Sequence, residues 1–145
     1  MILSHTETIN ASLDVVYELL TDPAKQLLWR DGLVSIEPPI DPKSISRVGT
    51  RTTEIFQKGR KRTVFTIESE VIALDKPTLY KTHISNADFS GDITYRLDTV
   101  AGATRLVSEA DMTYRGNAVA RFLGQMAAHH NRADMKALIR LAEAA

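Results

Sequence analysis

His130 and Asp134 have the residue types and spacing best suited to chemistry in this 145-residue chain. They are four residues apart in a stretch with helical periodicity, so both side chains fall on one helix face. An imidazole titrates near neutral pH, and a carboxylate one turn away can orient the ring and raise its basicity. The pair is half of a general-base arrangement, and contact with a ligand or a structural role fits the same spacing.

Other catalytic and cofactor motifs are missing from the sequence. Its seven glycines form no G-x-G-x-x-G or Walker-type loop, and no serine has a nucleophile-elbow context. The four histidines offer only the neighbours His129 and His130, whose side chains diverge by about 100° on a helix. We therefore predict no metal, no nucleotide and no other cofactor.

The composition is that of an ordinary globular domain. The 18 basic and 18 acidic side chains cancel, whereas proteins that bind nucleic acids normally carry a basic excess. The sequence contains no cysteine, no signal-peptide pattern and no run of apolar residues long enough to span a membrane. We expect one cytoplasmic domain over residues 1–145, with no nucleic-acid partner and no integral membrane segment, as a monomer or a homodimer.

The elements that must position these residues can be read from periodicity and turn signals. A strand is expected at residues 2–10, followed by short helices at 12–21 and 24–30, with Asp22 as N-cap and Pro23 at the first position of the second helix. Six further strands are expected, at residues 33–37, 48–57, 62–74, 78–85, 89–99 and 103–114. Their short connections force neighbouring strands to run antiparallel. Residues 117–144 read as one amphipathic helix.

Specific stretches resemble a known superfamily. They are residues 9–22 with Trp29 and Gly32 after them, residues 48–51 (Val-Gly-Thr-Arg) and residues 102–106 (Gly-Ala-Thr-Arg-Leu). The chain resembles the helix-grip superfamily, also called START-like or SRPBCC, which includes the birch-pollen allergen and the polyketide cyclase/dehydrase families. The resemblance implies an α+β helix-grip fold, in which about seven curved antiparallel strands wrap around a long C-terminal helix. A cavity between sheet and helix would hold the ligand.

Strand alternation indicates which side chains face that helix, because the apolar face of the sheet must be the covered one. Six polar residues map to the interior, and each would cost roughly 1–3 kcal/mol if buried without a partner. Five lie on strands, Ser69, Thr82, Tyr95, Ser108 and Tyr114, and the sixth, His130, lies on the helix. Bound water or a bound ligand would satisfy them. With their apolar neighbours, the predicted ligand-contacting residues are Trp29, Phe65, Ser69, Tyr80, Thr82, Tyr95, Ser108, Met112, Tyr114, Phe122, Met126 and His130.

Three functions remain open at this point. The favoured one is a carrier or sensor that binds a small hydrophobic or aromatic molecule, such as a lipid, a polyketide or a quinone. The second is an enzyme similar to the polyketide cyclases and dehydratases, in which His130 and a tyrosine, Tyr95 or Tyr114, would handle protons. The third is a protein-interaction module of the same fold. The sequence does not decide whether a reaction is catalysed.

Overall fold

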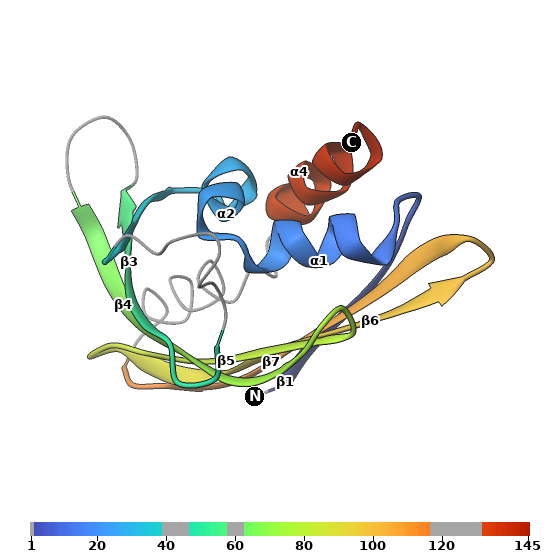
Figure 1. The fold of residues 1–145 in the computed structure, drawn as a ribbon. Coiled ribbons are helices and arrows are strands. Elements are labelled where there is room, and N and C mark those ends of the chain that lie inside the picture. The colour runs from blue at the N-terminus through green and yellow to red at the C-terminus, as the bar shows by residue number, and fades with distance from the viewer. Residues whose placement is uncertain (1, 39–46, 58–62, 117–131) are drawn as a thin grey trace.

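The computed structural model describes residues 2–38, 47–57, 63–116 and 132–145. Seven strands form one antiparallel sheet in the order β1-β7-β6-β5-β4-β3-β2. Helices α1 (Leu13–Thr21), α2 (Pro23–Trp29) and α4 (Arg132–Glu143) lie on the concave face of this curved sheet (Figure 1). The strands are β1 (Ile2–Ile9), β2 (Leu33–Glu37), β3 (Arg51–Gln57), β4 (Thr63–Asp75), β5 (Leu79–Ser85), β6 (Phe89–Val100) and β7 (Ala103–Tyr114).

The expected helix-grip architecture is confirmed, and most predicted boundaries agree with the structure to within a residue or two. The strand expected at residues 48–57 was too long, because it begins only at Arg51. Gly49 has φ +94°, and the Thr50 amide donates to the Arg47 carbonyl at 3.0 Å, so the chain turns there instead of extending. Of the helix expected at 117–144, residues 132–143 are helical, and residues 117–131 lie outside the described part.

Both N-terminal helices begin at capping residues, as expected for α2. Ser12 precedes α1, and its hydroxyl accepts from the Val15 amide at 3.3 Å. Asp22 precedes α2, and its carboxylate accepts from the Ala24 amide at 2.9 Å, with Pro23 in the first turn. These caps fix where each helix starts and therefore which side chains it turns toward the sheet.

The inward alternation of the long strands is also confirmed. On β7, Leu106, Ser108, Ala110 and Met112 are buried, while the residues between them are more exposed. Cross-strand register places Ser108 opposite Tyr95 and Tyr95 opposite Tyr80, so these three polar residues form one row across the inner face. The core fills the space between this face and the helices, where α1 contributes Val16, Tyr17, Leu19 and Leu20.

Two long-range features tie the sheet together. Strand β1 pairs with β7 along its whole length, from Ile2 opposite Asp111 to Ile9 opposite Thr104. On β6, Gly91 lies so close to β7 that a Cβ atom there would clash with the Asp111 carbonyl oxygen and would lie 2.5 Å from the Met112 sulfur. Only glycine fits at this position without displacing the neighbouring strand.

Candidate functional site

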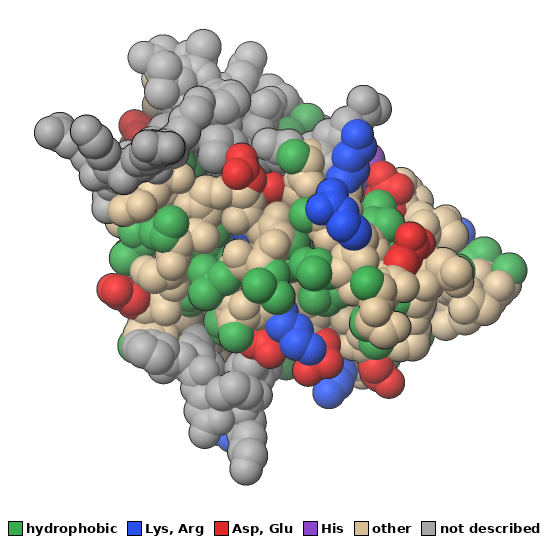
Figure 2. Space-filling view, turned by 90° about the horizontal axis from the view of Figure 1, so that it is seen from above, with side chains coloured by type: hydrophobic (Ala, Val, Ile, Leu, Met, Phe, Trp, Pro, Cys, Tyr) green, Lys and Arg blue, Asp and Glu red, His purple; other side chains and the backbone are tan. Residues whose placement is uncertain are grey.

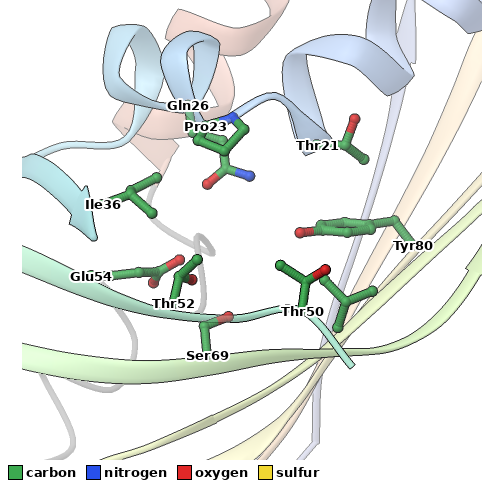
Figure 3. Close-up of a pocket in the computed structure, with 10 residues that line it drawn as sticks. Thr21, Pro23, Gln26, Ile36, Thr50, Thr52, Glu54, Ser69 and Tyr80 are labelled. Carbon is green, nitrogen blue, oxygen red and sulfur yellow. The ribbon is translucent and has the colours of Figure 1, made fainter. Parts of the chain in front are cut away.

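A polar crevice runs between α2 and the sheet, made of two adjoining cavities of about 30 and 20 Å³. Both are lined by Gln26, Glu54, Ser69 and Tyr80. Figure 3 shows the outer cavity, with Gln26 above, Glu54 and Ser69 below and the Tyr80 hydroxyl pointing in from the side. Each volume suits about one water molecule. The outer cavity is also lined by Thr21, Pro23, Ile36, Thr50, Thr52 and Val71, and the inner cavity by Leu20, Trp29, Arg30, Thr82, Ile84 and Tyr95.

The inner cavity has a buried ion pair in its wall. Arg30 donates to both carboxylate oxygens of Glu54, through Nη1 at 2.8 Å and Nη2 at 2.7 Å. The two side chains are only 2% and 8% exposed. Arg30 Nη1 also donates to Gln26 Oε1 at 2.7 Å, and the guanidinium carbon lies 5.4 Å from the centre of the Phe56 ring. These contacts make the pair rigid and mutually neutralised.

Helix α2 presents its polar residues inward, which is unusual for a helix that covers a sheet. Gln26 and Arg30 are one turn apart, and both are buried against the sheet. Leu27 and Leu28 are instead 41% and 64% exposed. Figure 2 shows that hydrophobic and charged side chains are mixed on the side of the molecule that bears the helices.

Two further hydrogen bonds hold α2 in this orientation. Gln26 Nε2 donates to the Leu20 carbonyl at 2.7 Å, and Trp29 Nε1 donates to the Leu19 carbonyl at 2.8 Å. Both acceptors lie in the last turn of α1, so they use carbonyl groups that have no partner within that helix. The two helices are thereby joined, and the orientation of Gln26 and Arg30 is set before any ligand is present.

The tyrosines of the crevice are buried, neutral hydroxyl groups. Burial raises the pKa of Tyr95 and of Tyr80 well above the ordinary value of a phenol, and the field of Glu54 acts in the same direction on both. A hydrogen bond with Gln26 accompanies Tyr80. The Tyr95 side chain is 3% exposed, and its hydroxyl has no hydrogen-bond partner among the described residues. The inner cavity therefore contains an unsatisfied polar group.

Asp134 is buried nearby, at the start of α4. Its Oδ1 accepts from the Asp31 amide at 2.9 Å, which ties α4 to the end of α2. Burial raises the pKa of Asp134 to about 6, although the Asp31 hydrogen bond and the field of Arg30 oppose this shift. The same carboxylate contributes to the raised pKa of Tyr95, so its field reaches the inner cavity.

The structure gathers part of the predicted ligand-contacting set in this crevice. Trp29, Ser69, Tyr80, Thr82 and Tyr95 line it. The other described members lie elsewhere on the inner face: Phe65 stacks on Phe56 with ring centroids 4.7 Å apart, Ser108 is buried beside Tyr95, and Met112 and Tyr114 follow toward the end of β7. Phe122, Met126 and His130 lie outside the described residues, so the expected His130–Asp134 pair stays a prediction.

Sequence reasoning missed Gln26, Arg30 and Glu54, which provide most of the polarity of the crevice. The period of two along a strand could have indicated Glu54, because it lies two residues before Phe56 on β3 and therefore on the same face. Both side chains are buried in the structure. The phase of α2 was harder to assign, since Leu27 and Leu28 suggest an apolar face that the structure exposes.

Neither a metal site nor a membrane span is found in the described part of the chain. No group of three or more histidine, aspartate or glutamate side chains there could hold a metal ion. No helix among the same residues has the length and hydropathy needed to cross a bilayer. The prediction that the protein uses no metal is untested by these observations.

Comparison with known proteins identifies the family. A family model described as polyketide cyclase/dehydrase and lipid transport matches residues 2–145. The chain belongs to this family. The resemblance inferred from residues 9–22, 48–51 and 102–106 is thereby confirmed. A search of curated proteins found no significant match.

Several solved structures share the fold of this polyketide cyclase/dehydrase family member. CV1439 from Chromobacterium violaceum superposes with a TM-score of 0.76 at 16% identity, covering 98% of this chain and 97% of its own. Ara h 8.0201, a Bet v 1-like protein, gives 0.73 at 15% identity, covering 100% and 99%. DynU16, from the dynemicin biosynthetic locus, gives 0.69 at 17% identity, and the match spans 96% of this chain but 46% of DynU16. At these identities the comparisons show the fold.

Proposed function

We propose that this protein binds a small apolar or aromatic molecule, of the lipid, polyketide or quinone type, whose polar end enters the crevice. The observation that carries the proposal is the Tyr95 hydroxyl, which is buried in the inner cavity and unpaired within the described structure. A buried hydroxyl without a partner destabilises the folded state by roughly 1–3 kcal/mol. An oxygen atom of a ligand, or water that stands in for it, would remove that penalty.

The dimensions of the crevice limit what part of the ligand it receives. Complete ligand sites usually measure about 300–1,000 Å³, whereas the two cavities measure about 30 and 20 Å³. An oxygen-bearing end group fits this space, and a whole ring system does not. The outer cavity provides the route inward, because its lining residues Ile36, Thr50 and Thr52 are only partly buried.

Native mass spectrometry of the freshly purified protein tests the proposal, combined with thermal shifts for fatty alcohols, quinones and aromatic polyketides. A bound ligand raises the melting temperature by mass action, and at 100 times its Kd it adds about 2.7 kcal/mol. We expect a copurified ligand, or a concentration-dependent shift that Tyr95→Phe reduces. The proposal is wrong if no mass is added and no compound of these three classes shifts the melting temperature.

The other expectations stay predictions. A cyclase or dehydratase activity depends on His130 acting with Tyr95 or Tyr114. A role as a protein-interaction module, a cytoplasmic location and the absence of a nucleic-acid partner rest on composition and on the family. Turnover of a model polyketone by the wild-type protein but not by His130→Ala would favour the enzyme over the carrier.

A further inference from the structure

The charged groups around the crevice limit which polar group a ligand can place there. We infer that it selects a neutral oxygen, a hydroxyl or a carbonyl group, and discriminates against a carboxylate or a phosphate. This inference rests on the proposed function, because it specifies which polar end the crevice receives.

Arg30 is the only guanidinium that lines the crevice among the described residues, and its charge is already compensated. Glu54 takes one hydrogen bond from each terminal nitrogen, at 2.8 and 2.7 Å. An arginine that receives an anionic ligand normally offers this two-pronged face to it. In this protein the two-pronged face is occupied by a carboxylate from the protein itself.

Glu54 also lines both cavities, so an anion that entered would approach a second negative charge in a buried environment. Among the described charged groups, Arg30, Glu54 and Asp134 are those whose fields act on the Tyr95 hydroxyl. One of these groups is a guanidinium and two are carboxyl groups. The inner cavity is therefore unfavourable for a further negative charge, in contrast to a typical anion-binding pocket.

The groups that remain to contact a ligand are neutral hydroxyls. Tyr95 and Thr82 line the inner cavity, and Ser69 and Tyr80 line both cavities. A hydroxyl both donates and accepts, so this set can pair with a phenol, an alcohol or a ketone without any charge entering the site. Tyr80, Tyr95 and Ser108 are cross-strand neighbours, so their hydroxyl groups extend this polar set across the sheet.

The experiment compares ligands that differ only in the polar group. Isothermal titration at pH 7.5 measures Kd for 4-phenyl-1-butanol, for 4-phenylbutanoate and for butylbenzene, whose alkyl arm can enter the crevice while the ring stays outside. We expect the alcohol to bind at least tenfold more tightly than the carboxylate. Tyr95→Phe should weaken binding of the alcohol about tenfold and leave binding of butylbenzene unchanged. Tyr17→Phe is the matched control, because the buried Tyr17 hydroxyl donates to the Leu79 carbonyl at 3.4 Å and does not line the crevice.

The outcomes separate the two proposals. If the carboxylate binds as tightly as the alcohol or more tightly, the selectivity is refuted while the binding function stands. If none of the three compounds binds, the selectivity is refuted, and the proposed function is refuted as well when no ligand copurifies and no fatty alcohol, quinone or aromatic polyketide shifts the melting temperature. Glu54→Gln adds a second measurement, since removing its charge should raise the affinity for the carboxylate relative to the alcohol. The comparison on the wild-type protein decides the question even if that variant does not fold.

Discussion

Arg30, which directly follows α2, and Glu54 on β3 are joined by two hydrogen bonds of 2.7 and 2.8 Å and are almost completely buried. The pair connects the helix layer directly to the sheet at the wall of the crevice. Each charge stabilises the other, because a single buried charge would have no favourable interaction to offset its desolvation cost. The relationship therefore contributes to both the stability of the fold and the polarity of the proposed ligand site.

Removing one partner of this pair should be strongly destabilising. Glu54→Gln leaves the buried Arg30 guanidinium uncompensated, and we expect a loss of about 3–5 kcal/mol in the free energy of unfolding, measured with urea. Asp98→Asn is the matched control, because Asp98 and Arg105 form a similar two-pronged pair that is about half exposed. That variant should lose about 1 kcal/mol or less. Equal losses in the two variants would contradict the assigned role of burial.

The N-cap of α2 should contribute both to the free energy of unfolding and to ligand affinity. Asp22→Ala removes the acceptor of the Ala24 amide, and we expect a loss of about 1 kcal/mol in unfolding free energy. Asp22→Asn keeps a capping oxygen and should stay within a few tenths of a kcal/mol of the wild type. Because α2 carries Gln26 and leads directly into Arg30, the alanine variant should also bind ligand more weakly. A stable alanine variant with unchanged affinity would argue against this dependence.

The contact between β6 and β7 makes Gly91 intolerant of a side chain. A Cβ there would clash with the Asp111 carbonyl oxygen, and a backbone atom in a paired strand cannot easily move. We expect Gly91→Ala to lower the free energy of unfolding by about 2–3 kcal/mol. Ser90→Ala, next to it on the same strand, should change stability little. Thermal denaturation of both variants provides the measurement.

Asp134 should give the protein a specific dependence on pH. Its pKa is raised from 3.8 to about 6, so the folded protein holds this proton more tightly than the unfolded chain does. Ionising Asp134 therefore lowers stability as pH rises from about 4 to about 6, and the penalty persists above pH 6. Asp134→Asn removes the penalty, so its stability relative to the wild type should improve by about 2 kcal/mol between pH 4 and pH 7.

Urea titrations at pH 4, 5, 6 and 7 would measure this difference. Asp88→Asn, an exposed aspartate in the turn before β6, provides the comparison. A stability difference between wild type and Asp134→Asn that stays flat across this range would show that the carboxylate has no raised pKa.

Much of the sheet was predictable because strand alternation and short turns give strong local signals. The inward positions of Tyr80, Tyr95 and Ser108 follow from a period of two along strands whose other face is solvated. The turn at Gly49 was missed because residues 48–50 have the composition of a strand, and only the positive φ of Gly49 shows the difference.

The composition of the site was less predictable, because it depends on contacts between distant elements. Gln26 and Arg30 are buried only because Glu54 lies opposite them and because the Leu20 carbonyl needs a donor. The local sequence of α2 does not indicate these contacts. Its two leucines, Leu27 and Leu28, predict that the opposite face of the helix is buried, whereas the structure exposes them. The volumes of the cavities likewise follow from how side chains meet across layers.

The pairing of β1 with β7 has a consequence for protein synthesis (Figure 1). Residues 2–9 leave the ribosome before their partners at 104–111, which follow roughly a hundred residues later, or about 5–20 seconds at 5–20 residues per second. During that interval the β1 segment has no strand to pair with, and its backbone amides and carbonyls are free to bind other chains. Correct folding of the nascent chain therefore depends on the β1 segment staying unaggregated until β7 has been synthesised.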